Sequence, residues 1–233
     1  MTPHNKLIDS LPAADRAALF ASGNQVDLSV GQSLQASRHS IARVYFPTSA
    51  YVSLQARTEP AGAEVMMVGH EGALGGQLVL GEGAQPLDMV VQGAGEALRV
   101  DGAAFGDQLA GSPALRAALH AYVDYMIQQI AISCGCVHGH VLLERLARRL
   151  LTTHDCARRA DFHVTHEFLA AVMGVRRVGV TNAASLLQDQ GLITYRRGEV
   201  SVVDRKGLEA ASCGCYADSR RTYTRAMRGV RDP

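Results

Sequence analysis

The stretch that decides the fold is THEFLAAVMGVRRVGVTNAASLLQDQGLITYRR, from Thr165 to Arg197. Thr165 is a favourable helix N-cap, and Gly174 can adopt the left-handed conformation that ends a helix. The small Ala170, then Gly174, then the branched Val180 follow at steps of four and six residues. This pattern is typical of two helices that meet at a tight corner. It predicts a helix-turn-helix whose second helix enters the major groove of DNA.

The segment that follows, LITYRRGEVSVVD, predicts a β-hairpin. Its strands are expected at Leu192–Tyr195 and Glu199–Val203, with the turn at Arg197–Gly198. A hairpin directly after a helix-turn-helix makes a winged helix. Two arginine pairs then lie at the start of the second helix and on the wing, where phosphates would pass: Arg176 and Arg177, Arg196 and Arg197. The alternative is a helical hairpin with a solvated charged face.

The charge of the chain is divided unevenly. Residues 1–140 hold 7 Lys and Arg against 12 Asp and Glu, whereas residues 141–233 hold 16 against 10. A basic C-terminal part suggests a module that binds a polyanion. Of the 23 basic residues, 21 are arginine, which suits bidentate contacts to phosphate and guanine. A GC-rich genome, which favours arginine codons, is the alternative explanation of this excess.

Residues 25–110 are predicted to be rich in β-strand. Short runs with Val, Tyr, Phe and Leu are separated by Gly, Pro or Ser every 8–12 residues, which suits a sandwich or jelly-roll barrel. The residues before this region, MTPHNKLIDSLPAADRAALF, predict a short amphipathic helix.

Residues 113–137 predict one long helix with Ser112 as N-cap and Pro113 in the first turn. Gly135 and Gly139 are expected to interrupt it and to form a hinge before a helix at Val141–His154. One apolar stripe follows a coiled-coil spacing and predicts a dimer seam, although a core helix of a monomer would carry a similar stripe. The stripe consists of Leu119, Val123, Met126, Ile130, Ser133 and Val137.

These features together resemble the Crp/Fnr family of bacterial transcription regulators. The most specific matches are LERLARRLL, the stretch from Phe168 to Val200, and LEAASCGCY. The resemblance implies an α+β fold with an N-terminal β-roll of the cyclic-nucleotide-binding, jelly-roll type, a long dimerisation helix and a C-terminal winged helix-turn-helix. The expected boundaries are 1–110 for the roll, 111–139 for the helix and hinge, and 140–233 for the DNA-binding domain. The implied partners are double-stranded DNA, a second copy of the chain and RNA polymerase.

The resemblance also assigns DNA contacts position by position. Thr165 and His166 match phosphate contacts, and Arg177 matches an arginine that reads guanine. Val178 and Asn182 stand where the cyclic-AMP-binding members have Glu and Arg, so we expect a changed base preference: Asn can bond adenine, and Val can contact a thymine methyl group. The expected DNA-binding residues are Thr165, His166, Arg176, Arg177, Val178, Thr181, Asn182, Arg196 and Arg197.

The roll lacks the family's cyclic-phosphate cassette. Gln77 stands in place of its Glu, Pro86 and Leu87 lie near the missing Arg and Ser or Thr, and no Arg occurs between residues 57 and 99. Because a buried phosphate without a cation is costly, cyclic AMP and cyclic GMP are not expected to bind. The tract GHEGALGG either lines a pocket for an unknown small-molecule effector or is only a structural turn. The residues in question are Glu71, Gly72, Gly75, Gly76 and Gln77.

No cofactor is predicted. The five cysteines all lie at residue 134 or later, which speaks against the N-terminal iron–sulfur cluster of some members. Haem would need ligands such as His39 or His70, which are candidates by residue type only. The tract CGCVHGH nevertheless brings soft ligands together at the hinge, and it supports an alternative function as a metal- or redox-responsive regulator. These weak metal candidates are Cys134, Cys136, His138 and His140.

An enzyme and a signalling adaptor are the other classes of function to consider. The sequence contains no Ser/His/Asp order, paired-carboxylate motif or P-loop, so an enzyme is not expected, although His70 and Glu71 could in principle do acid–base chemistry. A non-DNA signalling adaptor with a ligand-binding roll is a further alternative. No apolar run approaches the roughly 18 residues of a membrane helix, and no signal-peptide pattern occurs, so we expect a cytoplasmic protein without membrane contact.

Overall fold

The computed structural model describes residues 4–35, 39–57, 62–81 and 86–231. Its N-terminal half is the predicted β-roll, made of two antiparallel sheets with strand orders β1-β7-β3 and β2-β6-β4-β5. Inward and outward side chains alternate along β6, as expected for a strand with one face on a core. The strands are β1 (Gly23–Leu28), β2 (Ser33–Gln35), β3 (Arg43–Pro47), β4 (Tyr51–Ala56), β5 (Ala63–Val68), β6 (Asp88–Gly93) and β7 (Gly95–Asp101).

The roll carries more short helices than the sequence predicted. The N-terminal segment forms two helices, α1 (Lys6–Asp9), with Ser10 as its C-cap, and α2 (Ala13–Ser22), with Pro12 as its N-cap. The prediction of strand up to residue 110 was wrong at its end, where α3 (Gly102–Gly111) buries Phe105 and Leu109. These two residues are four apart, which is a helical spacing. A short 3₁₀ helix, η1 (Gly76–Leu80), lies between β5 and β6.

The predicted long helix is α4 (Pro113–Gly139). Its N-cap is confirmed, because the Ser112 hydroxyl accepts a hydrogen bond from the Leu115 amide at 3.0 Å. Gly135 does not interrupt the helix, contrary to expectation. The chain leaves the helix at His140 and continues in α5 (Leu142–Ala157), so the hinge is a two-residue corner.

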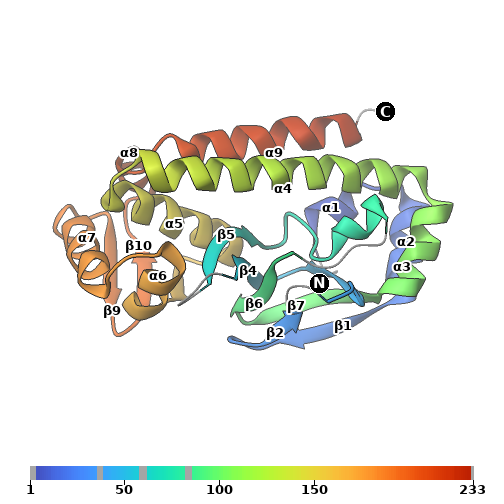
Figure 1. The fold of residues 1–233 in the computed structure, drawn as a ribbon, viewed down its shortest axis with the longest axis horizontal. Helices are drawn as coiled ribbons and strands as arrows, with labels where there is room; N and C mark the ends of the chain where they lie inside the picture. The colour runs from blue at the N-terminus through green and yellow to red at the C-terminus, as the bar shows by residue number, and fades with distance from the viewer. Residues whose placement is uncertain (1–3, 36–38, 58–61, 82–85, 232–233) are drawn as a thin grey trace.

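A C-terminal helix that the sequence did not reveal, α9 (Cys215–Arg231), runs back along α4 in the opposite direction (Figure 1). Its far half reaches the roll. Met227 belongs to the roll's buried core, and the Tyr223 hydroxyl donates a hydrogen bond of 2.8 Å to the Glu71 carbonyl oxygen. The C-terminal segment therefore links the winged-helix half to the β-roll.

The C-terminal half is the predicted winged helix around a core of its own. Buried residues of α5, α7 and the wing meet there, among them Leu150, Val180 and Val200. A third strand, β8, was not predicted and completes a sheet of order β8-β10-β9. The elements are β8 (Asp161–His163), α6 (His166–Met173), α7 (Arg177–Asp189), β9 (Ile193–Arg196), β10 (Glu199–Val202) and α8 (Arg205–Ala211).

The two halves are joined by a buried ion pair. Arg149 on α5 places its Nε 2.6 Å from Glu64 Oε1 on β5, and its Nη2 donates to Glu64 Oε2 at 3.0 Å. Gln92 on β6 accepts from the same Nη2 at 2.9 Å. Among the described residues, no helix is both long and apolar enough to cross a membrane.

Candidate DNA-binding interface

The corner of the helix-turn-helix is built as the sequence predicts. The Thr165 hydroxyl accepts a hydrogen bond from the Phe168 amide at 3.1 Å and caps α6. Gly174 has a φ of 64° and turns the chain between the helices. Val180 is fully buried beneath the corner, and Ala170 is buried on the facing helix. The small side chain of Ala170 allows the close approach that fixes the angle of α7.

The first turns of α7 expose basic, apolar and amide side chains. Arg176 is its N-cap, and Arg177 is its first residue; both side chains are exposed. Val178 is 62% exposed. Asn182 is also exposed, one turn further along. Nothing in the described part of the chain covers these side chains, which are open to solvent.

Besides Thr165, two more of the predicted contact residues, Thr181 and His166, have side-chain partners within the protein. Thr181 Oγ lies 3.0 Å from His166 Nδ1 and also donates to the Arg177 carbonyl oxygen at 3.1 Å. The His166 ring stacks against Tyr195 of the wing with 4.3 Å between ring centroids. Burial, and secondly the Arg177 guanidinium, lowers the pKa of His166. Through these contacts His166 holds α6 and α7 against the wing.

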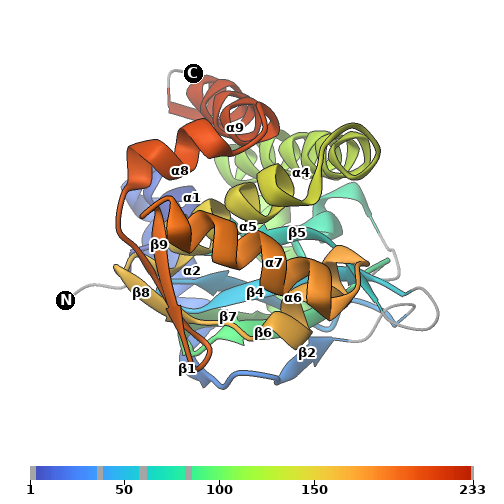
Figure 2. The same cartoon turned by 90° about the vertical axis from the view of Figure 1, so that its left-hand side faces the viewer.

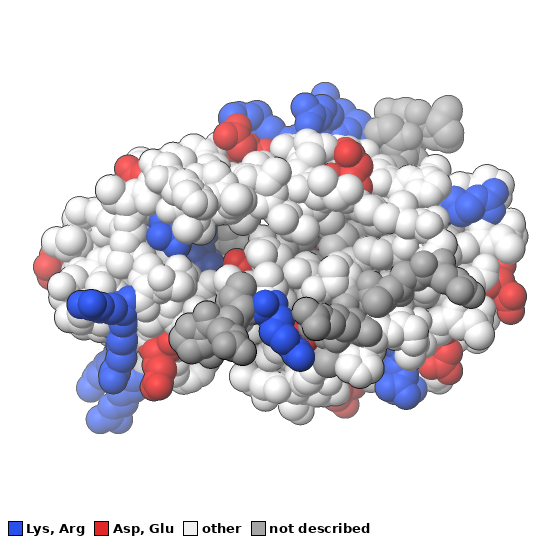
Figure 3. All heavy atoms as spheres, in the orientation of Figure 1, with Lys and Arg blue, Asp and Glu red and all other residues white. Residues whose placement is uncertain are grey.

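The wing turns at the residues that the sequence indicated. Arg197 and Gly198 have φ values of 54° and 88°, the signature of a tight two-residue hairpin turn. A Cβ at Gly198 would lie 2.5 Å from the His163 ring on β8, so the position also requires a small residue. Arg196 and Arg197 are exposed at this tip. Figure 2 looks onto this end of the molecule, and Figure 3 shows Lys and Arg side chains gathered at the lower left, over the wing end.

The glycine-rich tract of the roll is packed against the long helix. A Cβ at Gly72 would lie 1.8 Å from the Tyr122 hydroxyl on α4, and one at Gly76 would lie 3.0 Å from Leu119. Gly75 has a φ of 79° and lies against the backbone of β3. Gln77 Oε1 is buried without a hydrogen-bond partner. Of the two interpretations of this tract, these contacts favour the structural turn.

Glu71 and His70, unlike the glycines of the tract, line a cleft. The Glu71 carboxylate accepts a hydrogen bond from the Gly69 amide at 2.9 Å, and burial raises its pKa. The adjacent His70 is buried, and burial together with Lys6 and Arg158 lowers its pKa to about 4. His39, the other residue considered for haem, is exposed on a different part of the roll.

This cleft, of about 1070 Å³, is lined by residues of the roll and of α4, α5 and α9. Basic side chains outnumber acidic ones on its walls. Seven are basic and three are acidic: Lys6, Arg145, Arg148, Arg149, Arg158, Arg220 and Arg228, against Glu64, Glu71 and Asp155. The residues Gly72, Gly75, Gly76 and Gln77 do not line it.

The predicted dimer seam combines two faces of α4. Leu119 and Met126 lie in the core of their own chain, and Val123 is also buried, so they are not available to a partner. Ser133 is turned toward α5, where its hydroxyl accepts a hydrogen bond from Arg148 at 3.2 Å. Ile130 and Val137 of the predicted stripe are exposed, whereas the residues above are not. Apolar or sulfur side chains exposed at steps of three, four and three residues are Ile127, Ile130, Cys134 and Val137.

The side chains of the CGCVHGH tract point in two different directions. Cys134 is exposed, and its carbonyl oxygen lies 3.0 Å from His138 Nδ1 on the outer face of α4. Cys136 and His140 point instead toward a second cysteine pair, Cys213 and Cys215, whose role the sequence did not indicate.

Comparison with known proteins identifies the C-terminal half. A family model described as the Crp-like helix-turn-helix domain matches residues 144–211. The chain carries a Crp-like helix-turn-helix. This Crp-like domain spans α5 to α8, so it includes both arginine pairs and the whole wing. No curated protein sequence matches the chain.

Solved structures of transcription regulators share this fold over about four fifths of the chain. FixK2 from Bradyrhizobium japonicum aligns with a TM-score of 0.68 at 13% identity, covering 82% of this chain and 98% of that one. CLP from Xanthomonas campestris, described as a c-di-GMP-responsive global regulator, aligns with a TM-score of 0.66 at 13% identity, covering 82% and 99%. A transcriptional regulator of the CRP family from Thermus thermophilus gives a TM-score of 0.65 at 15% identity, covering 80% and 96%.

Proposed function

We propose that the protein is a sequence-specific, DNA-binding transcription regulator that acts as a homodimer. The observation that carries the proposal is the exposed surface of the Crp-like domain, where the start of α7 and the wing tip both present arginine pairs. The two α7 helices of a dimer would enter successive major grooves about 34 Å apart. Contact with RNA polymerase is a further expectation that only the family resemblance supports.

The test is fluorescence anisotropy on a labelled duplex of random sequence, titrated at several salt concentrations. The logarithm of affinity should fall steeply with the logarithm of salt concentration, and each lost phosphate contact should reduce the slope by about 1. Arg196→Ala and Arg197→Ala should each flatten the slope. Arg43→Ala, which removes an exposed arginine from the roll, should leave it unchanged. Absence of binding at low salt would exclude the proposal and favour the adaptor.

The homodimer part of the proposal rests on the exposed stripe of α4. Ile127 is 60% exposed and Val137 is 54% exposed, and they lie on one helical face with Ile130. A second copy of α4 would cover them in a two-fold seam. Sedimentation should show a dimer for the wild type and a monomer for Ile127→Glu. Val30→Glu, a change at an exposed apolar residue of the roll, should remain dimeric; a monomeric wild type would refute the seam.

The cleft between the two halves is our proposed place for a small-molecule effector. Its seven Lys and Arg against three acidic residues favour an anion, and a ligand there would contact both halves at once. Thermal-shift measurements with a panel of nucleoside phosphates and organic acids should give stabilisation that Arg220→Ala removes. Stabilisation that is unchanged in Arg220→Ala, or none with any anion, would place the effector elsewhere.

A further inference from the structure

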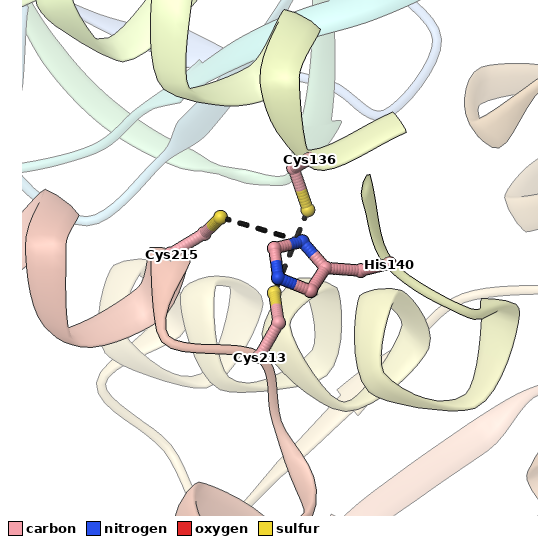
Figure 4. A group of neighbouring side chains, drawn as sticks. All are labelled: Cys136, His140, Cys213 and Cys215. Carbon is pink, nitrogen blue, oxygen red and sulfur yellow. Dashed lines mark hydrogen bonds between the residues drawn. The ribbon is translucent and has the colours of Figure 1, made fainter. Parts of the chain in front are cut away.

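Four soft side chains that are far apart in the sequence meet at the hinge between α4 and α5. Two come from the end of α4 and the corner after it, and two from the connection between α8 and α9 (Figure 4). Their ligand atoms all lie within 4.8 Å of one another. We call this group the Cys/His cluster. Its members are Cys136, His140, Cys213 and Cys215.

Two separations within the Cys/His cluster match those of a tetrahedral metal shell. With metal–sulfur bonds of about 2.3 Å and metal–nitrogen bonds of about 2.0 Å, ligand atoms at the corners of a tetrahedron lie about 3.5–3.8 Å apart. Cys136 Sγ lies 3.5 Å from Cys213 Sγ. Cys215 Sγ lies 3.7 Å from His140 Nδ1. Both separations fall within the tetrahedral range, while the sulfur–sulfur distance far exceeds the roughly 2.05 Å of a disulfide.

Backbone structure explains why the four side chains converge. Cys136 and His140 are one helical turn apart, and the His140 amide still bonds the Cys136 carbonyl oxygen at 3.3 Å. They therefore project from the same side of the end of α4. Cys213 and Cys215 flank Gly214 at the start of α9, where the Tyr216 amide bonds the Cys213 carbonyl oxygen at 3.1 Å.

The surroundings of the Cys/His cluster suit a bound cation. Cys136 and Cys213 are buried, whereas the other two are partly exposed, so an ion could enter from one side. Three thiolates and a neutral imidazole around a divalent ion carry one negative charge in total. Arg148 on α5 interacts electrostatically with Cys215 and would offset that charge.

We propose that the Cys/His cluster binds one zinc ion as a structural site. A Cys₃His set is among the ligand sets that hold structural zinc, and soft thiolates select for it over hard cations such as Mg²⁺ and Ca²⁺. Because the protein fills all four positions, no coordination site is left for a substrate. Binding replaces the three thiol protons, which pass to the solvent.

The zinc would tie the start of α9 to the corner between the long helix and the winged helix. α9 is already held at its other end, where Tyr223 and Met227 contact the roll. With zinc bound, α9 becomes a strut fixed at both ends alongside α4. Loss of the metal should therefore loosen α9 and the corner before it affects the roll.

Metal analysis of the purified, reduced full-length chain tests the site. Wild type should contain a single zinc ion per chain, and Cys213→Ser and Cys215→Ser should lose it. The chain provides matched controls in Cys134→Ser and His138→Gln, which change the same residue types in the same tract outside the Cys/His cluster. Both controls should keep the metal.

A second measurement separates loss of metal from loss of fold. Metal-free wild type titrated with Co²⁺ should develop the absorption bands of tetrahedral, thiolate-bound cobalt. His140→Cys should also bind Co²⁺, with the spectrum shifted toward that of a four-thiolate site, because it keeps four ligands. The proposal is overturned if wild type binds neither metal, if Cys213→Ser keeps its zinc, or if mass spectrometry shows a disulfide between Cys136 and Cys213.

Discussion

Breaking the buried ion pair between Arg149 and Glu64 should destabilise the protein strongly. Each side chain is only 9% exposed, and two close N–O contacts of 2.6 and 3.0 Å join them. In Arg149→Met, the Glu64 carboxylate would stay buried with the Ser53 hydroxyl, at 2.6 Å, as its remaining neutral donor. Leaving one charge of a buried pair without its partner costs about 3–5 kcal/mol. We expect Arg149→Met to lower the unfolding free energy by that amount.

The double variant separates the charge from the packing. Arg149→Met combined with Glu64→Met removes both charges and keeps most of the volume, so its stability should return close to that of wild type. Urea unfolding followed by circular dichroism measures all four members of this cycle. A loss below about 1 kcal/mol in Arg149→Met is what a solvated surface pair would give. That result would contradict the packing of α5 against β5.

Three further changes test other contacts. Gly72→Ala should cost about 1–3 kcal/mol in urea unfolding, because its Cβ would overlap the Tyr122 hydroxyl; an unchanged midpoint would show that the tract is not packed on α4. Thr165→Ala should cost about 1 kcal/mol by loss of the cap on α6, and Thr165→Ser should restore it; equal stability of the two variants would contradict the cap. The pKa of His70 is lowered to about 4, so between pH 6.5 and 4 the unfolded chain binds the extra proton. Unfolding free energy should therefore fall by about 3 kcal/mol as the pH drops through this range, and the fall should be smaller by that amount in His70→Gln; identical pH profiles would contradict the burial of His70.

The winged helix could be predicted because local residues determine it. Thr165 caps a helix through its own side chain, and Gly174 and Gly198 adopt conformations that other residues resist. Each signal acts within a few residues, so a single sequence contains it. The hairpin prediction was correct to within about a residue for the same reason.

The dimer seam shows where periodicity is insufficient. α4 is apolar on more than one side, since Leu119 faces its own roll while Ile127 is exposed. A repeat of three and four residues gives the spacing of a stripe, but it does not tell which stripe faces the roll and which faces solvent. Only the position of the roll and α9 around the helix settles the phase.

The Cys/His cluster shows the limit set by distance along the chain. Cys136 and Cys213 are separated by 77 residues, and their meeting depends on the return of α9 along α4. The sequence indicated metal ligands in the CGCVHGH tract, but a helix places Cys134 and His138 on its outer face. A Cys and His four residues apart, matched with a distant Cys pair, is the signal that could have found the site.

Selection of binding sites from a pool of random duplexes tests the central claim most directly. A homodimer that reads bases through α7 should enrich two symmetric half-sites whose centres are about 10 base pairs apart. Arg177→Ala should lose preference at one base position in each half-site, and the positions facing Val178 and Asn182 should differ from those of the cyclic-AMP-binding members. A selected pool without any enriched motif, or a motif unchanged by Arg177→Ala, would contradict the account.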